Sequence, residues 1–544
     1  MKKLQFKIHL MVAVIGLLLV GTTCSQKTKE EVPKRPNIIF IMSDDHAYQA
    51  ISAYDDELIQ TPNIDRLAEE GMLFTNASVT NSICAPSRAT ILTGKHTHIH
   101  GKIDNVFPFD TTNVTFPQIL QDNGYQTAMF GKLHFGNKPK GFDEFKILPG
   151  QGDYYNPEFI TSEGDTTVEG YVTDIITDLT IDWFDNRREE EKPFMLFYLH
   201  KAPHREWIPA PRHYREFTKR NFPEPETLFD DYEGRGTAAR EAEMNILRHM
   251  TVSADNKIYP EVAKELGIKE MSEWGFRVFD QKYSRFTEEQ KQDWDEVYGP
   301  INERFKEIYP HMNDTSYMRW KYQRYMQDYL ATIAAVDENV GRLLTYLDEN
   351  GLSENTIVVY TSDQGFYLGE HGWFDKRFIY NESFKTPLLV KWPEKIKAGT
   401  VSTEMVQNLD FAQTFLEAAG VEAPDDMQGE SLMPLLEGNT DQWTRDAVYY
   451  HYYEYPGFHM VKRHYGMVTQ DYKLAHFYYD IDEWELYDRK KDPMELNNVY
   501  NDPAYADEVK ELREKLKNMR KKYKDSEELD QRYIDMYKKR GIIK

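Results

Sequence analysis

Four short apolar segments constrain the fold of this chain, because polar residues follow directly where they end. The segments lie at residues 36–42, 125–130, 194–199 and 356–361. Apolar runs of this length between polar or turn-forming residues are typical of buried strands. Helical patterns lie between them, at residues 63–70, 116–123 and 317–350. Short buried strands that alternate with helices predict an α/β fold with a large, mostly parallel sheet.

Polar clusters follow the first and the last of these strands. Ser43-Asp44-Asp45-His46 comes after the first, and Thr361-Ser362-Asp363-Gln364-Gly365 comes after the last. In such sheets ligands bind beyond the carboxyl ends of the strands. Three carboxylates and an amide are oxygen ligands, which favours Ca²⁺ or Mg²⁺ over zinc. An Asp-Asp pair alone is more often a helix cap or a turn, so this interpretation depends on the other motifs.

The pentapeptide Cys84-Ala85-Pro86-Ser87-Arg88 contains one of the two cysteines of the chain. The other, Cys24, lies beside a hydrophobic leader, so the mature chain has no intrachain disulfide. A lone cysteine at fixed spacing from Pro and Arg indicates that the thiol itself is processed or used. We expect residue 84 just before a helix at 86–92, whose N-terminus favours an anion.

The pattern C-x-P-S-R resembles the signature of type I sulfatases, in which the cysteine is oxidised to formylglycine (3-oxoalanine). Gly131-Lys132-Leu133-His134, Ala202-Pro203-His204 and the segment 369–377 follow in the order that this family shows. Taken singly, the lysine of such a motif is most often an exposed side chain, and the histidine is most often a hydrogen-bonded side chain of the core. Together they imply an alkaline-phosphatase-like α/β sandwich and hydrolysis of sulfate monoesters.

The resemblance implies one divalent cation, usually Ca²⁺. Asp44, Asp45, Asp363 and Gln364 would hold it, with the modified Cys84 as a further ligand and as the nucleophile. Gln364 stands where many members have Asn or His, but its carbonyl oxygen can still coordinate.

The resemblance also implies roles for the basic residues. Arg88, with Ser87, would orient the formylglycine hydrate, and Lys132 and Lys376 would bind sulfate oxygens. His134 would help to deprotonate the second hydroxyl during collapse of the sulfated intermediate. His204 would contact the substrate and protonate the leaving sugar oxygen, a task that suits the pKa of histidine. Cations and a metal offset the negative charge that keeps water away from a sulfate ester.

The rest of the chain divides into further parts. Residues 215–312 read as an insertion that shapes the rim of the site. From residue 442 on, strand patterns at 447–453, 465–469 and 473–478 precede a charged helix at 504–523. We therefore predict a catalytic domain at 36–441 and a smaller C-terminal α+β subdomain with an antiparallel sheet at 442–544.

The first residues are typical of a secretory signal. Three lysines precede the apolar run Leu10–Val20, which is shorter than the about 20 residues that span a bilayer. We predict a signal at 1–23, a tether at 24–35 and export to the periplasm or the cell surface. Either Cys24 is lipidated and attaches the protein to a membrane, or ordinary cleavage occurs nearby.

The net charge of −24 argues against a nucleic-acid partner, because phosphate contacts need clustered Lys and Arg. The expected partners are a sulfated carbohydrate and a sulfatase-maturing (formylglycine-generating) enzyme. Among substrates we favour an algal polysaccharide such as ulvan, with His464 as a further contact. The alternatives are an N-acetylglucosamine-6-sulfatase acting on glycosaminoglycan or mucin, a phosphonate or phosphate monoester hydrolase, and a non-catalytic glycan-binding relative.

Overall fold

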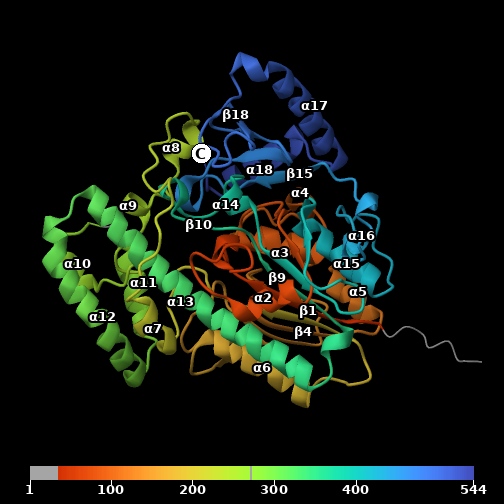
Figure 1. Ribbon diagram of the computed structural model, residues 1–544, viewed down its shortest axis with the longest axis horizontal. Helices are drawn as coiled ribbons and strands as arrows, with labels where there is room; N and C mark the ends of the chain where they lie inside the picture. Colours follow the sequence, from red (N-terminus) through yellow and green to blue (C-terminus); the bar gives the residue numbers. More distant parts are fainter. Residues whose placement is uncertain (1–34, 270–272, 544) are drawn as a thin grey trace, which may run out of the picture. The chain divides into compact units, whose positions relative to one another are not determined.

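A ten-stranded sheet forms the centre of the fold in the computed structural model, which describes residues 35–269 and 273–543 (Figure 1). The strands follow the order β13 (Thr400–Ser402), β2 (Met72–Phe74), β12 (Leu388–Lys391), β9 (Thr356–Ser362), β1 (Asn37–Ser43), β8 (Phe194–Leu199), β4 (Gln126–Lys132), β5 (Glu144–Leu148), β6 (Glu158–Thr161) and β7 (Asp165–Thr167). Strands β9, β1, β8, β4 and β5 are parallel to one another. The four predicted strands and the mostly parallel sheet are confirmed. The predicted leader and Cys24 lie outside the described residues.

The register of the central strands brings the polar motifs to one edge of the sheet. Ser43 of β1 pairs with Ser362 of β9, so Asp44 and Asp363 leave the sheet at the same level. Met42 pairs with Leu199 of β8, which in turn pairs with Gly131 of β4. The Gly131-Lys132 and His204 motifs therefore begin at this edge as well.

Helices cover both faces of the sheet, because alternate side chains of the central strands face opposite ways. Ile39 and Ile41 face one core, which includes residues of α13 (Asp314–Glu349), α6 (Val172–Asn186) and α2 (Pro62–Glu69). Phe40 faces the other core, which includes residues of α3 (Cys84–Thr93), α5 (Phe116–Asp122) and α15 (Phe411–Ala418). The expected α/β sandwich is confirmed.

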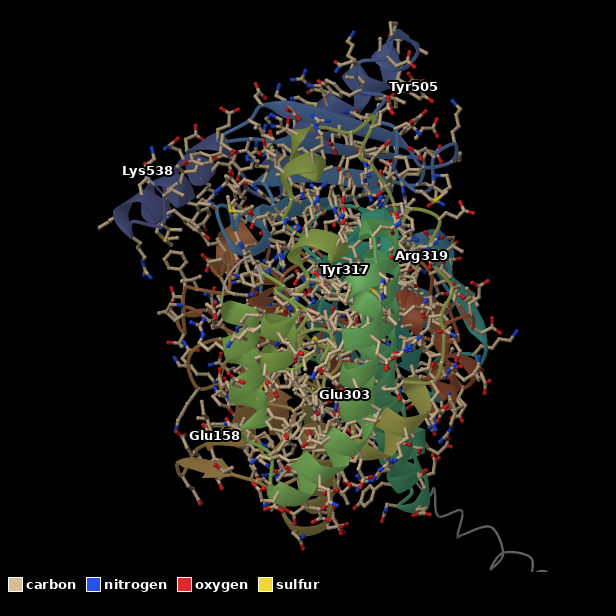
Figure 2. All side chains as sticks on the ribbon, turned by 90° about the vertical axis from the view of Figure 1, so that its left-hand side faces the viewer. Glu158, Glu303, Tyr317, Arg319, Tyr505 and Lys538 are labelled. Atoms are coloured by element: carbon tan, nitrogen blue, oxygen red, sulfur yellow. The ribbon has the colours of Figure 1, made fainter. Side chains whose placement is uncertain are left out.

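The insertion predicted at 215–312 is a packed helical layer beside α13. It contains α8 (Thr237–Glu241), α9 (Ile246–His249), α10 (Pro260–Glu265), α11 (Trp274–Tyr283) and α12 (Glu288–Ile308), preceded by α7 (Pro211–Phe217). It has an apolar core of its own, in which Phe276 and Phe305 pack together with Val252 and Ile258. Figure 2 looks onto this side, with Glu303 labelled on α12 and Tyr317 on α13.

The C-terminal part is an antiparallel sheet with two helices. Its strands are β15 (Ala447–Tyr452), β16 (His464–Thr469), β17 (Tyr472–Phe477) and β18 (Glu483–Asp488), followed by α17 (Ala506–Lys522) and α18 (Glu527–Lys539). Strand β18 was not predicted from the sequence, because its polar pattern includes a carboxylate that is buried in the fold. Glu485 accepts hydrogen bonds from the hydroxyls of Tyr380 (2.7 Å) and Tyr487 (3.0 Å). The boundary at 441/442, between α16 (Met433–Leu436) and β15, stays a prediction.

The described chain also contains shorter strands and α-helices. They are β3 (Ala77–Ser78), α4 (Thr97–His100), β10 (Tyr367–Leu368), β11 (Phe374–Asp375), α14 (Asn381–Phe384) and β14 (Val406–Gln407). None of the helices in the described ranges combines the length and the apolar composition that a membrane span requires.

We expect Gly131→Ala to lower the free energy of unfolding by about 3 kcal/mol. Gly131 has φ +109°, and a Cβ there would lie 1.8 Å from the carbonyl oxygen of Leu199 on the paired strand. Gly438→Ala is the matched control, because Gly438 has φ +79° but open space around its Cβ position. The control substitution should lower the free energy of unfolding by only about 1 kcal/mol. Equal losses in urea denaturation would contradict the backbone contact as the cause.

Candidate active site

Three fully buried carboxylates lie together beyond the ends of β1 and β9. Oxygens of Asp44, Asp45 and Asp363 lie within 4.8 Å of one another. Burying an ionised carboxylate is costly unless it is paired. The structure supplies the pairing with three buried cations, which are Arg88, Lys132 and Lys376.

Arg88 connects three elements at this edge of the sheet. It lies one turn into α3, and its Nε donates to Asp363 Oδ2 at 2.9 Å. Its Nη1 donates to the backbone carbonyl of Lys132 at the end of β4. Its Nη2 lies 2.8 Å from Asp363 Oδ2 and 3.5 Å from Asp44 Oδ1. A guanidinium suits this position, because its planar donors reach several acceptors at once.

The two predicted sulfate-binding lysines each pair with one carboxylate. Lys132 contacts Asp44, and Lys376 Nζ lies 2.6 and 2.7 Å from the two oxygens of Asp45. Burial lowers the pKa of Lys132. Burial also opposes the charge on Lys376, but the neighbouring acidic groups, Asp45 first among them, together outweigh burial and raise the pKa of Lys376. Both amines therefore lie at the carboxylate cluster.

Cys84 is the first residue of α3, and its side chain is fully buried. Its Sγ lies within 4.8 Å of the nearest Asp44 oxygen and of a ring nitrogen of His204. The helix begins two residues earlier than predicted, which places residue 84 at the positive end of the helix dipole. Burial raises the pKa of the thiol well above its usual value. An unmodified Cys84 would therefore remain a protonated, weakly nucleophilic thiol.

His204 presents one ring nitrogen to the cluster. Its Nδ1 lies 2.6 Å from the carbonyl oxygen of Arg205, so Nδ1 carries the proton and donates it. Nε2 then points to the site, 3.7 Å from Asp45 Oδ2. Burial and the charge of Lys132 lower the pKa of His204 far below its usual value. A bound anion would offset part of that positive field and raise the pKa, which a proton donor requires.

His134 lies close to the same positive charges. It follows Lys132 by two residues with φ +66°, and its side chain is half-buried. Burial, followed by the charges of Lys132 and Arg88, lowers its pKa far below the usual value. Its imidazole is therefore neutral and able to accept a proton, and its proposed role stays a prediction.

The oxygen atoms of the cluster fit a divalent cation. Among the described residues, Asp44 Oδ1 and Gln364 Oε1 are buried and accept no hydrogen bond. The amide nitrogen of Gln364 donates to Asp45 instead, and the amide can turn to present its oxygen. Burial raises the pKa of Asp45, against the lowering effect of Lys376. A cation held by Asp44, Asp45, Asp363 and Gln364 would satisfy these oxygens and supply Lewis-acid stabilisation of charge.

The structure does not support His464 as a substrate contact. Its side chain is fully buried on β16. Its Nδ1 lies 2.8 Å from the carbonyl oxygen of Lys462, and its Nε2 accepts the backbone N–H of Ile379 at 3.2 Å. Both ring nitrogens are thus used inside the protein, and the ring stacks on Tyr450 and Phe477. This histidine anchors the antiparallel sheet to the segment that carries Lys376.

Some residues that hold the site in place were not predicted from the sequence. Asn408 donates from Nδ2 to Ser87 Oγ at 2.8 Å, and Ser87 in turn donates to the backbone carbonyl of Asp363. No motif marks Asn408, which precedes α15. Asp375 and Arg377, in contrast, flank Lys376 in the quoted segment, and their oxygen and Nε atoms lie 3.2 Å apart. The high density of charged residues in the segment 369–377 could have indicated that Asp375 and Arg377 belong to the site.

Arg88→Lys should lower the free energy of unfolding by about 2 kcal/mol, although it keeps the charge. An ammonium cannot reach both Asp363 and the Lys132 carbonyl, so one buried acceptor loses its donor. Urea denaturation measures the loss. Arg304→Lys is the control, because Arg304 forms an exposed ion pair with Glu307 on α12. This control should change the free energy of unfolding by less than about 0.5 kcal/mol. A loss no larger than in the control would show that Arg88 contributes charge alone.

Calcium should raise the melting temperature of the protein, with a stabilisation of about 2.7 kcal/mol at a free concentration of 100 times Kd. Asp44→Asn should lose most of this response, because it removes a ligand charge while keeping the shape of the side chain. Differential scanning calorimetry with and without Ca²⁺ measures both. An equal response in the variant would assign the ion to another place, such as the buried group His451, Asp525 and Asp530.

Comparison with known proteins agrees with this geometry. The sulfatase family model matches residues 36–421, and a model of the C-terminal part of N-sulphoglucosamine sulphohydrolase matches residues 369–522. The chain is 51% identical to an N-acetylglucosamine-6-O-sulfatase of Bacteroides thetaiotaomicron, over 93% of this chain and 89% of that protein. It is 24% identical to an ulvan-active sulfatase of Formosa agariphila, over 92% and 85% of the two chains.

A solved structure of a protein in complex with its substrate D-glucosamine-2-N,6-O-disulfate superposes with a TM-score of 0.86. The two chains are 50% identical, over 91% of this chain and 99% of that one. The fold, the motifs at the strand ends and the family model all indicate a sulfatase. The chain belongs to the sulfatase family and is a sulfuric ester hydrolase.

Proposed function

We propose that this sulfatase removes the 6-O-sulfate from N-substituted glucosamine units of a glycan. The observation that carries the proposal is the 51% identity to an N-acetylglucosamine-6-O-sulfatase along nearly the whole chain. The similarity to a structure that holds a 6-O-sulfated glucosamine supports the same sugar.

The expectation of ulvan as the favoured substrate gives way to this alternative. The ulvan-active sulfatase is only 24% identical, less than half the identity shared with the N-acetylglucosamine-6-O-sulfatase. Specificity depends on side chains that touch the sugar, and these diverge more readily than the sulfate site. The higher identity therefore favours the glucosamine substrate.

The residues of the site suit sulfate ester hydrolysis. Lys132 and Lys376 supply positive charge for the sulfate oxygens, and His204 Nε2 is the nitrogen that can pass a proton to the leaving sugar oxygen. A formylglycine hydrate at residue 84 would supply the hydroxyl that attacks sulfur. A divalent cation, Ca²⁺ by family resemblance, would stabilise charge on the sulfate. Arg88 and Ser87 hold the start of α3 against Asp363 and so fix the position of residue 84.

Maturation of Cys84 is part of the proposal. The residues Cys84 to Arg88 are all buried, and they form the first turn of α3. Because the side chain of Cys84 is fully buried in the fold, we infer that a modifying enzyme acts on the chain before the fold is complete. Mass spectrometry of the peptide that spans residue 84 tests the modification, and a fully active preparation with an intact thiol would overturn it.

The decisive assay compares sulfate release from N-acetylglucosamine 6-sulfate, its 3-sulfate isomer, ulvan oligosaccharides and an aryl phosphate. We expect kcat/KM for the 6-sulfate to exceed the others by about 100-fold or more, because the sulfate and the sugar ring must fit together. Faster turnover of ulvan fragments would restore the algal substrate. Faster turnover of the aryl phosphate would favour the phosphate monoester hydrolase.

Cys84→Ala is the matched control for this assay. It should abolish sulfate release while leaving the melting temperature nearly unchanged, since it removes only the few side-chain atoms beyond the Cβ of residue 84. Residual release above the background of the empty-vector preparation would contradict residue 84 as the nucleophile.

A further inference from the structure

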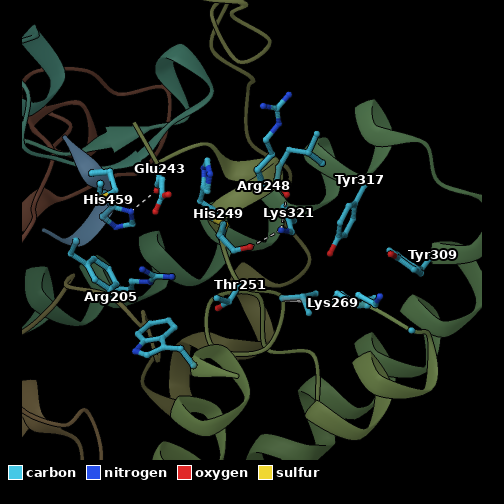
Figure 3. Close-up of a pocket in the computed structure, with 18 of the residues that line it drawn as sticks. Arg205, Glu243, Arg248, His249, Thr251, Lys269, Tyr309, Tyr317, Lys321 and His459 are labelled. Atoms are coloured by element: carbon cyan, nitrogen blue, oxygen red, sulfur yellow. Dashed lines mark hydrogen bonds between the residues drawn. The ribbon is translucent and has the colours of Figure 1, made fainter. Parts of the chain in front are cut away.

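A cavity of about 680 Å³ lies between the helical insertion, the start of α13 and the loop at residues 457–460 (Figure 3). Its volume falls within the range of small-molecule sites. No residue of the sulfate site described above lines it, although Arg205, directly after His204, does. The cavity is therefore separate from the chemistry but borders it.

The cavity borders the sulfate site through two residues of the 457–460 loop. His459 Nε2 lies 3.2 Å from Asp375 Oδ2, and Asp375 immediately precedes the sulfate-site residue Lys376. The centroid of the Phe458 ring lies 5.8 Å from the guanidinium of Arg205 and 5.9 Å from that of Arg377. The 457–460 loop thus lines the cavity and also contacts the segment that carries Lys376.

The wall of the cavity is positive. Its charged lining residues comprise four cations and one carboxylate, which are Arg205, Arg248, Lys269, Lys321 and Glu243. The guanidinium of Arg205 donates two hydrogen bonds of 2.6 Å to the carboxylate of Asp255, which fix its position. Arg248 and Lys269 are exposed to solvent and line the cavity. In a chain of net charge −24, such a cationic hollow favours an anionic ligand.

Aromatic rings form the rest of the wall. Trp274 lies under the guanidinium of Arg205 at 4.6 Å and beside Phe458 at 6.0 Å. Across the cavity, Tyr309 and Tyr317 pack edge to face with their centroids 5.2 Å apart. Figure 3 shows the hydroxyl of Tyr317 directed toward the hollow. Flat aromatic surfaces beside cations suit the apolar faces and the charged groups of sugar rings.

We propose that this cavity binds an anionic saccharide unit next to the sugar that loses its sulfate. The inference rests on the proposed function, since it places the neighbouring sugar of the same glycan. Arg248 and Lys269 would contact the carboxylate or sulfate group of that unit, and Trp274 with Tyr317 would contact its ring. The substrate would then be a chain with alternating charged sugars rather than a neutral glycan.

The test compares kcat/KM on four substrates that share a 6-O-sulfated N-acetylglucosamine. They are the monosaccharide and three trisaccharides that carry it at the non-reducing end, followed by a neutral sugar, a uronate or a sulfated uronate. We expect an advantage of about tenfold for the anionic trisaccharides over the neutral one. The double variant Arg248→Gln, Lys269→Gln should remove this advantage, and Arg304→Gln on the surface of α12 should keep it.

The outcomes separate the two proposals. An advantage for both anionic trisaccharides supports a carboxylate contact, and an advantage for the sulfated one alone supports a sulfate contact. Equal rates on neutral and anionic trisaccharides, with the monosaccharide still cleaved, would overturn the inference and leave the proposed function standing. Absence of release from all four substrates would overturn the proposed function.

Discussion

Three ionised carboxylates cannot share a dry interior without positive charge beside them, and this requirement organises the whole site. Asp44 and Asp45 come from the end of β1 and Asp363 from the end of β9, while the compensating cations come from α3, β4 and the loop after β11. Electrostatic compensation thus connects a helical layer, the sheet and a loop. Removing one partner would leave an uncompensated buried charge, which costs about 3–5 kcal/mol.

The same pairing explains how the site can serve two ligands of opposite charge. In the structure Lys132 contacts Asp44, and Lys376 contacts Asp45. We infer that a divalent cation, by taking over these carboxylates, would release both ammonium groups toward a sulfate. Cation and anion would then strengthen each other's binding, because each satisfies charges that the other leaves unpaired.

The sequence predicted the parts of the site that follow from strand periodicity and from local motifs. Asp44 and Asp363 converge because parallel neighbours in register end at the same edge. Asn408 was out of reach, because it meets Ser87 only through packing across a sequence separation of 321 residues. The role expected of His464 was wrong, since one residue of register decides which face of a strand a side chain occupies. On β16 that face is the one packed against Phe378 and Tyr450.

A chain with a strong negative net charge can bind an anionic substrate, because electrostatic interactions through solvent act only over short distances. At physiological salt, charges separated by more than about 8 Å of solvent are largely screened. A glycan near the cavity therefore responds to Arg248 and Lys269 at its wall more than to the distant acidic surface. Inside the site the buried side chains of Lys132, Lys376 and Arg88 would act on a sulfate at short range and at lower dielectric. Local placement of a few cations thus decides anion binding, and net charge does not.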